Sequence, residues 1–248
     1  MDSFDELIHP MTVQEFFTKY WGKEHFVIKA QCGACTEWMK NLYTWDDFNK
    51  YVNQYPYIRG LQILNYDDKD DRFCLDKVRS KKLDQPFFTK NQVYEFWKQG
   101  KSFVIPMAEY QKEGLVDICS AIERYFGMGC ANVYCSPGGG SKSFPPHADS
   151  TENFLLHNHG KTKWTMYKEF APEKPKTIIA EYELEPGDLL YIPIGQYHKA
   201  ESMTPRISTS VHFHNKKNQS IKHFKIRSEN REPYYNFKYF LNEDSNNK

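Results

Sequence analysis

The sequence contains no long apolar run and no excess of charge of either sign. Its net charge is +1 over 248 residues, so no whole-molecule field favours nucleic acid or a membrane surface. The first residues, MDSFDELIHP, lack the basic and apolar regions of a secretory signal, and no run approaches the length of a membrane span. We therefore expect a soluble, cytoplasmic protein without a membrane partner.

Cysteine is sparse, and the chain has no internal repeat and no linker rich in Pro, Gly or Ser. Six Cys in a chain expected inside the cell favour thiols over disulfides. Cys32 and Cys35 form a single CxxC, but a structural zinc site needs a second ligand pair and a thioredoxin-like site needs a βαβ setting. We interpret this CxxC as structural or incidental.

The chain does contain enough apolar residues, 40%, to bury a sizeable core as one or two domains. Its first half alternates short helices, begun by capping residues such as Thr12, Thr44 and Thr89, with short strands. We expect helices at about 12–20, 44–55, 89–98 and 110–126, and strands at 25–29, 61–64 and 102–106, with a weak strand near Phe73.

From Ala131 the hydrophobic period changes to that of short strands between turn signals. We expect strands at 132–135, around His147, and at 153–157, 162–167, 177–183, 189–192 and 207–213. Several short strands at such regular spacing favour a sandwich or barrel. The second half is therefore expected to be an all-β core.

Three residues of this core are candidate metal ligands. In PPHADS, His147 and Asp149 point the same way if the segment is extended, because side chains alternate along a strand. The turn and apolar run from Glu185 to Pro193 bring His198 just past a strand end, where it can complete the set. Two His and one carboxylate on one face of a metal are typical of non-haem Fe(II) oxygenases.

The segments NVYCSPGGGSKSFPPHADSTENFLLHNHGKTKWTMY and LEPGDLLYIPIGQYHKAE resemble the cupin-like, JmjC-type branch of the 2-oxoglutarate oxygenases, nearest to the ribosomal oxygenases and related protein hydroxylases. FFTKYWGKEHFVIKA is similar to the lead-in of the same group. The resemblance implies a double-stranded β-helix (cupin, jelly-roll) core at 129–215. An α+β region at 1–128 would pack on this barrel, and residues 216–248 would form a basic, aromatic extension.

The same resemblance implies Fe(II) as metal, with 2-oxoglutarate and O2 as cosubstrates. His147, Asp149 and His198 match the metal ligands, and Asn132 and Asn153 match Asn residues near the cosubstrate. Tyr134 is a candidate cosubstrate donor, with a core role as the alternative.

The chain departs from this family at Thr162, the position that usually supplies a Lys or Arg for the distal carboxylate of 2-oxoglutarate. Strand parity directs Lys161 and Lys163 outward if Thr162 faces inward. Arg206 and Ser208 resemble an Arg-x-Ser pair that other branches of the superfamily use for this carboxylate, and we expect them to replace the missing cation. The alternative is a surface Arg before a strand.

The remaining His residues have simpler expected roles. His157 and His159 flank the turn at Gly160 and are expected to be exposed, whereas His212 shares the inward parity of Ser208 and can line the pocket. Glu185 and Asp188 are expected to be turn residues.

The expected activity is hydroxylation of a side-chain carbon in a protein or peptide, with release of succinate and CO2. Three alternatives stay open. They are hydroxylation or demethylation of RNA or a small molecule, a metal-binding cupin without oxygenase activity, such as an isomerase, and a degenerate interaction module. The basic tail from Asn215 could contact RNA, and a homodimer is compatible with the sequence.

Overall fold

The computed structural model describes residues 3–30, 36–64, 87–126, 129–141, 143–168 and 177–213. Cys32, Cys35, the weak strand expected near Phe73 and the extension at 216–248 lie outside the described residues.

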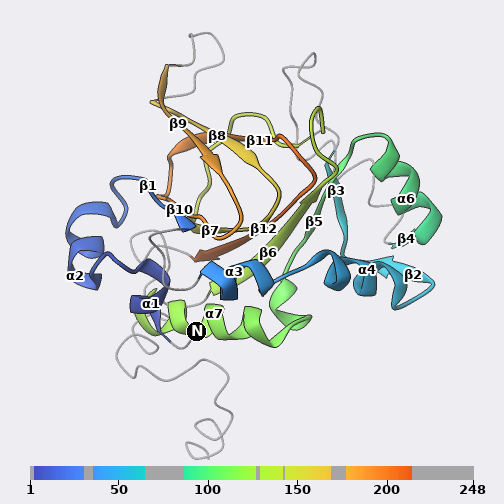
Figure 1. Ribbon diagram of the computed structural model, residues 1–248, viewed down its shortest axis with the longest axis horizontal. Helices are drawn as coiled ribbons and strands as arrows, with labels where there is room; N and C mark the ends of the chain where they lie inside the picture. Colours follow the sequence, from blue (N-terminus) through green and yellow to red (C-terminus); the bar gives the residue numbers. More distant parts are fainter. Residues whose placement is uncertain are drawn as a thin grey trace, which may run out of the picture.

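Two antiparallel sheets that face each other form the centre of the fold (Figure 1). The larger sheet has seven strands in the order β1-β10-β7-β12-β6-β5-β3, and the smaller has three in the order β11-β8-β9. Their bounds are β1 Phe26–Ile28, β3 Gln62–Leu64, β5 Ser102–Ile105, β6 Gly129–Ser136, β7 Glu152–His159, β8 Thr162–Tyr167, β9 Ile178–Leu184, β10 Leu189–Ile192, β11 Tyr197–Ser202 and β12 Arg206–Phe213.

Alternation along the strands of the larger sheet separates an aliphatic and polar inner face from an aromatic outer face. Between the two sheets lies a small apolar cluster made of Leu155, Trp164, Met166, Leu184, Leu190 and Ile192. The opposite face of the larger sheet buries Phe154, Tyr191 and Phe213 against Phe4, Phe16 and Phe126 from the helices. The outer face thus holds most of the apolar core. The space between the sheets contains the small apolar cluster and, beside it, polar side chains.

The first half of the chain surrounds the larger sheet. It contributes β1 at one edge of this sheet, and β5 followed by the edge strand β3 at the other side. A separate two-stranded sheet pairs β2 (Tyr57–Arg59) with β4 (Phe87–Thr89). The helical segments are α1 Phe4–Ile8, α2 Val13–Glu15, η1 Phe16–Tyr20, α3 Thr36–Asn41, α4 Trp45–Asn53, α6 Lys90–Lys98, η3 Ala108–Tyr110 and α7 Glu113–Phe126. Figure 1 shows α7 below the larger sheet, on the side away from β8 and β9.

Three of the expected helix starts, at Thr12, Thr44 and Thr89, are confirmed by their caps. Thr44 and Thr89 each form a full capping box, with Asp47 and Gln92 respectively. Thr12 accepts a hydrogen bond from the Glu15 N–H, but the helix it begins continues as a π-helix to Tyr20. The long helix begins at Glu113, three residues after the expected start, because a 3-10 turn takes up 108–110.

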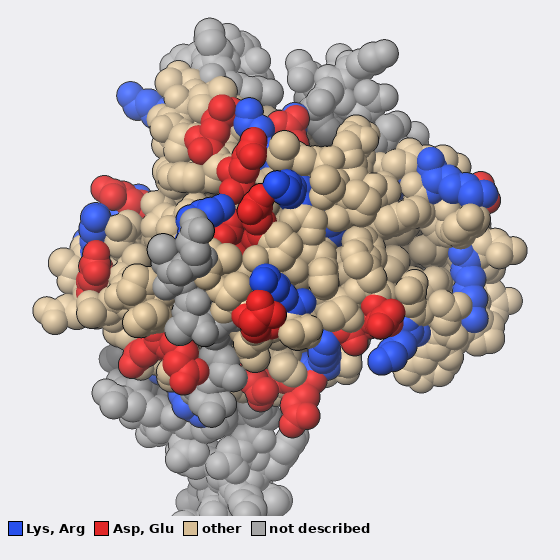
Figure 2. All heavy atoms as spheres, viewed as in Figure 1, with Lys and Arg blue, Asp and Glu red and all other residues tan. Residues whose placement is uncertain are grey.

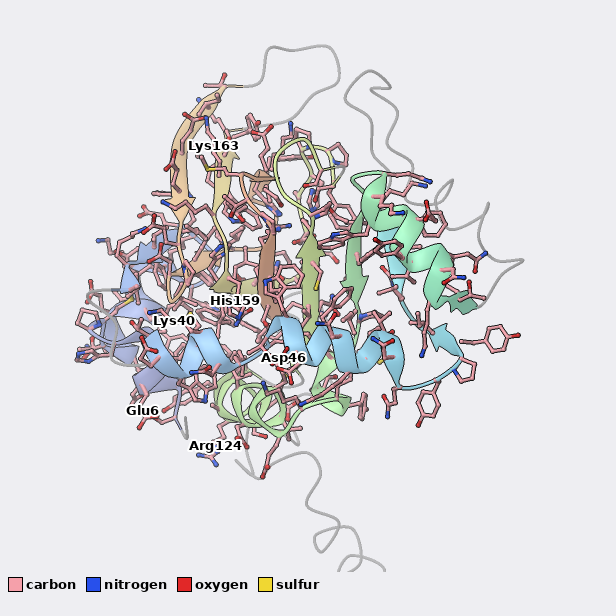
Figure 3. All side chains as sticks on the ribbon, turned by 45° about the vertical axis from the view of Figure 1, so that its right-hand side comes forward. Glu6, Lys40, Asp46, Arg124, His159 and Lys163 are labelled. Carbon is pink, nitrogen blue, oxygen red and sulfur yellow. The ribbon has the colours of Figure 1, made fainter. Side chains whose placement is uncertain are left out.

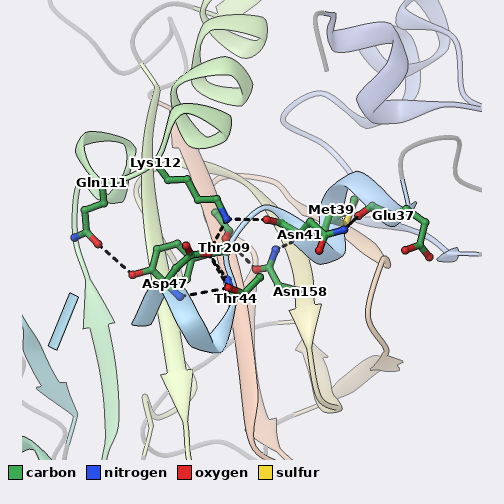
Figure 4. A network of polar contacts seen from close by, with 10 residues as sticks. Glu37, Met39, Asn41, Thr44, Asp47, Gln111, Lys112, Asn158 and Thr209 are labelled. Carbon is green, nitrogen blue, oxygen red and sulfur yellow. Dashed lines mark hydrogen bonds and ion pairs between the residues drawn. The ribbon is translucent and has the colours of Figure 1, made fainter. Parts of the chain in front are cut away.

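A polar network fixes α3 and α4 to the sheet (Figure 4). The Asn158 side chain on β7 donates to the carbonyl of Met39 (2.7 Å) and accepts from Thr209 on β12 (2.9 Å). Lys112, just before α7, donates to the Asp47 carboxylate (2.6 Å) and to the Asn41 carbonyl (2.8 Å). Figure 3 shows Lys40 of α3 and Asp46 of α4 in one row of helices, next to the strand end at His159. The end of α3 is therefore attached to β7 and β12 by buried hydrogen bonds, and α4 is attached to the residue that precedes α7.

The surface over β8, β9 and β11 has alternating charges. Lys163 pairs with Glu181, and Lys199 pairs with Glu201. In the view of Figure 2, basic and acidic side chains are intermixed and no field of one sign covers this face. Among the helices described, none has both the length and the apolar character that crossing a membrane requires.

Two expectations about strands were wrong. His147 lies in the loop between β6 and β7 and makes only an isolated bridge, because Pro145 and Pro146 cannot donate ladder hydrogen bonds. His198 follows the end of β10, as expected, but it lies inside a further strand, β11, where none was expected. The sequence Tyr197–Ser202 has few apolar residues, so it carries no periodic signal.

Candidate active site

His147, Asp149 and His198 meet at one end of the space between the sheets. A pair of backbone hydrogen bonds joins His147 to His198, with N···O distances of 3.0 and 2.8 Å, and so ties the loop to β11. The backbone N–H of Gly195 donates to the Asp149 carbonyl at 3.0 Å. One potential donor atom from each of the three side chains lies within 4.8 Å of the other two.

Both imidazole rings are oriented by backbone carbonyls. Nδ1 of His147 is 2.8 Å from the Pro145 carbonyl oxygen, and Nδ1 of His198 is 2.9 Å from that of Gln196. Because a carbonyl can only accept, each neutral ring carries its proton on Nδ1 and presents a lone pair at Nε2. The two Nε2 atoms lie 3.6 and 3.7 Å from the oxygens of Asp149, so the lone pairs and the carboxylate converge.

The electrostatics favour a neutral His198. Burial lowers its pKa to about 4, with a further contribution from His147, while the Asp149 carboxylate opposes the shift. A neutral ring at physiological pH is the form that binds a metal. Two imidazoles and one carboxylate that converge beside an open space fit an Fe(II) ion, which needs positions left for cosubstrates.

A cavity adjoins these three residues. The enclosed volume of this cavity is small, about 40 Å3, and the cavity opens to solvent on one side. It is lined by Tyr134, Ser143, Phe144, His147, Asp149, Asn153, Leu155, Trp164, Ile192, His198, Ala200, Arg206, Ser208 and Ser210.

Arg206 is the only Lys or Arg among the described residues that line this cavity. Its side chain is 2% exposed, and its Nε donates to the Ser136 hydroxyl at 3.3 Å. Nη1 has no hydrogen-bond partner, and no carboxylate forms an ion pair with Arg206 within the described part of the chain. Burial lowers the Arg206 pKa to about 10, which still leaves the guanidinium charged at neutral pH. The cavity therefore contains an uncompensated positive charge.

The structure confirms the expected parity of β8. Thr162 is fully buried and its hydroxyl has no partner among the described residues, whereas Lys161 and Lys163 form surface ion pairs with Glu185 and Glu181. Neither lysine can reach the interior. The inner cation comes from β12, as the sequence analysis anticipated, and the surface alternative for Arg206 was wrong.

Some of the other candidate cosubstrate residues line the cavity and one does not. Ser208 and Tyr134 are cross-strand partners on β12 and β6 and both line the cavity. Burial, together with the negative charge of Asp149, raises the pKa of the Tyr134 hydroxyl to about 12, so it remains a donor. Asn153 lines the cavity but donates to Asp149. Asn132 accepts from the Met107 N–H at 3.3 Å and is not among the described lining residues, so its cosubstrate role stays a prediction.

The expectation that His157 is exposed was wrong. It is 1% exposed, and its Nε2 lies 2.9 Å from the Gly160 carbonyl oxygen. The segment 204–206 covers this turn, since Lys161 N–H donates to the Thr204 hydroxyl. Burial and the charge of Arg206 lower the pKa of His157 to about 4, so the buried ring is neutral. His159 is half-buried, and His212 is not among the described residues that line the cavity.

The turn residues match expectation, and two site residues were missed. Asp188 accepts from the Ala30 and Glu185 N–H groups, which closes the turn before β10. Trp164 lines the cavity with an indole N–H that lacks a partner among the described residues. Ser136 holds Arg206 from β6. Ser136 lies two residues after Tyr134 on β6, so strand alternation alone would have predicted that it faces the same side as Tyr134.

Residues 106–221 match the JmjC domain family. The chain is 27% identical over 213 residues to the bifunctional lysine-specific demethylase and histidyl-hydroxylase NO66 of Dictyostelium discoideum, covering 79% of this chain and 39% of that protein. It is 28% identical over 227 residues to ribosomal oxygenase 2 of Rattus norvegicus, covering 84% and 46% respectively. The chain thus spans less than half the length of these relatives.

Solved structures of the ribosomal oxygenase YcfD from Escherichia coli share the fold. The complex with cobalt and succinic acid has a TM-score of 0.60 at 18% identity and covers 82% of this chain and 51% of that one. The complex with cobalt and 2-oxoglutarate has a TM-score of 0.56 at 17% identity and covers 82% and 52%. The two facing sheets thus share the jelly-roll core of a cupin-like fold with these structures, and the match of residues 106–221 to the JmjC domain family agrees with this fold.

Proposed function

We propose that this chain is an Fe(II)- and 2-oxoglutarate-dependent dioxygenase that hydroxylates a side-chain carbon of a protein or peptide. The observation that carries the proposal is the pairing, in one cavity, of a His-Asp-His ligand set with an uncompensated guanidinium. A metal-binding cupin without a dicarboxylate ligand has no need for a buried positive charge. Arg206 therefore favours the oxygenase over the isomerase and the binding module.

His147, Asp149 and His198 would hold the iron. The iron, when bound, supplies the oxidising chemistry in which substrate, O2 and 2-oxoglutarate yield hydroxylated substrate, succinate and CO2. The contribution of the chain is positional: the carbonyls of Pro145 and Gln196 fix the two imidazole rings in the tautomer that leaves Nε2 free.

Arg206 would bind the distal carboxylate of 2-oxoglutarate. A buried guanidinium without a counter-ion is costly, and a carboxylate would neutralise it and accept from its unpartnered Nη1. Ser208 faces the same cavity two residues along β12. Thr162, at the position where the family usually has a cation, is buried and its hydroxyl has no partner among the described residues, but it is not among the described residues that line the cavity. Tyr134 remains protonated and can donate to the same ligand.

The proposed substrate class is based on the names of the similar proteins. One of them is named a histidyl-hydroxylase and lysine-specific demethylase, and others are named ribosomal oxygenases. These names support a protein side chain as substrate. They also support a second candidate reaction, demethylation, because hydroxylation of an N-methyl carbon gives a hemiaminal that collapses. RNA contact through the C-terminal tail and a homodimer remain proposals. So does the division of the chain into an N-terminal region at 1–128, a core at 129–215 and an extension at 216–248.

The test is an anaerobic titration of the Fe(II)-loaded protein with 2-oxoglutarate, followed by the weak visible charge-transfer band of bidentate chelation. We expect the band in the wild type and its loss in His147→Ala. Release of CO2 from labelled 2-oxoglutarate in air would then demonstrate turnover. Absence of the band in the wild type at millimolar cosubstrate would overturn the proposal and favour the isomerase or binding module.

A further inference from the structure

Asp149 has the most exposed side chain of the three candidate ligand residues. It lies in the loop before β7, and its side chain is 38% exposed, whereas that of His198 is 4% exposed. A backbone hydrogen bond from Gly195 holds its main chain, but it does not set the direction of the carboxylate. The imidazole rings are each fixed by a carbonyl, so the carboxylate needs a restraint of its own.

Asn153 supplies this restraint. Its side-chain Nδ2 donates to Oδ2 of Asp149 at 2.9 Å and to the Thr151 carbonyl at 3.2 Å. Ser210, on the neighbouring strand β12, donates from its hydroxyl to Oδ1 of Asn153 at 3.2 Å, which fixes the amide in this orientation. Asn153 and Ser210 are only 5% and 4% exposed, so water competes little for these contacts.

The same contacts leave Asn153 little capacity for another ligand. A carboxamide has two N–H groups, and both are used here by acceptors of the chain itself. A carboxylate of 2-oxoglutarate can only accept, so it would have to displace Asp149 or Thr151 to bind this amide. Asn153 therefore faces the cavity but is committed to the metal-ligand carboxylate.

We propose that Asn153, held by Ser210, is a positioning residue that orients Asp149 for metal binding and is not a cosubstrate ligand. The inference rests on the metal centre of the proposed function. In this proposal the hydrogen bonds from Ser210 to Asn153 and from Asn153 to Asp149 orient the carboxylate, as the carbonyls of Pro145 and Gln196 orient the two His rings. Residues that orient metal ligands typically change metal affinity by about 10- to 100-fold when removed.

The experiment measures the affinity of the protein for Co(II), without 2-oxoglutarate, from the growth of the visible absorption of the bound ion. Asn153→Ala is expected to weaken Co(II) binding by about 10- to 100-fold and to change the shape of the absorption. Ser210→Ala should weaken it less, because the amide stays in place but can turn, and Ser210→Thr should retain wild-type affinity. Ser202→Ala is the matched control, since that buried hydroxyl has no partner among the described residues.

The outcomes separate this inference from the proposed function. A wild type that does not bind Co(II) would overturn both. If wild-type binding is tight and Asn153→Ala and Ser210→Ala both bind Co(II) as tightly, the positioning role is overturned while the metal centre stands. If, in addition, the 2-oxoglutarate requirement of Asn153→Ala rises, Asn153 is a cosubstrate ligand. If Asn153→Ala does not fold, the Ser210 variants still test the inference. Equal Co(II) affinities of Ser210→Ala and Ser210→Thr would refute the role of Ser210 in holding Asn153.

Discussion

Replacing Arg206 with methionine should weaken the binding of 2-oxoglutarate without weakening the fold. The substitution keeps much of the buried apolar stem and removes the charge whose Nη1 lacks a partner among the described residues. A charge-assisted hydrogen bond contributes roughly 1.5 to 3 kcal/mol. Since about 1.4 kcal/mol corresponds to a factor of ten, the half-saturating 2-oxoglutarate concentration should rise roughly 10- to 150-fold.

The assay is the anaerobic charge-transfer titration, because it reports cosubstrate binding without a protein substrate. Arg124→Met, on the exposed side of α7, removes the same charge far from the cavity and should leave the titration unchanged. Thermal unfolding of the Arg206→Met protein without ligands should occur at an equal or higher temperature, since replacing a buried charge by an apolar side chain is often neutral or stabilising. Ligand binding and stability should therefore change in different directions.

The reasoning would be refuted by a folded Arg206→Met protein with an unchanged half-saturating concentration. A second variant tests where the charge is needed. Adding Thr162→Lys to Arg206→Met returns a cation to the β8 position that usually carries it, and partial recovery of 2-oxoglutarate binding is expected. No recovery in a folded double variant would show that the geometry of β12, and not charge alone, determines binding.

Three further predictions concern the metal, the acid stability and a turn. His198→Ala should weaken Co(II) binding by at least about 100-fold, since it removes a buried ligand, and equilibrium titration would measure this. Burial raises the pKa of the Asp47 carboxyl, but hydrogen bonds from Lys112 and Thr44 outweigh burial and hold the pKa below its usual value. Asp47 therefore stabilises the fold at pH values above its unfolded pKa of about 3.9. This contribution is lost as the pH falls through the lower pKa of the folded state. Lys112→Met should reduce this loss, as denaturant unfolding between pH 2 and 6 would show; an unchanged profile would contradict the role of Lys112. Gly160→Ala should lower the unfolding free energy by more than about 2 kcal/mol, because φ is +78° and a Cβ would meet the Pro205 carbonyl oxygen at 2.0 Å; Gly140→Ala, at φ +80° with open space around it, should cost only the backbone strain of about 1 kcal/mol.

The three candidate ligands were recognisable from their spacing, and the candidate cation was recognisable from a family resemblance combined with strand parity. His147, Asp149 and His198 follow from spacing, and the inward direction of Arg206 and Ser208 follows from the two-residue period of a strand. The same period placed Lys161 and Lys163 outside, where the structure has them.

What the sequence could not give depends on contacts between distant segments. His157 was expected to be exposed because its turn contains Gly160, but the chain at 204–206 folds over that turn. Strand β11 was missed because its pairing with β8 compensates for a polar sequence. The commitment of Asn153 to Asp149 requires the hydroxyl of Ser210, which lies 57 residues away.

The arrangement of the larger sheet bears on how this protein can be divided. The JmjC match begins at residue 106, yet β1 at Phe26–Ile28 closes one side of the sheet by pairing with β10, and β5 closes the other by pairing with β6. A fragment beginning at 106 would expose two open strand edges and the aromatic face that Phe4 and Phe16 cover. The smallest unit expected to remain soluble on its own therefore includes the N-terminal strands, and the boundary of the family match is not a boundary of the folded body.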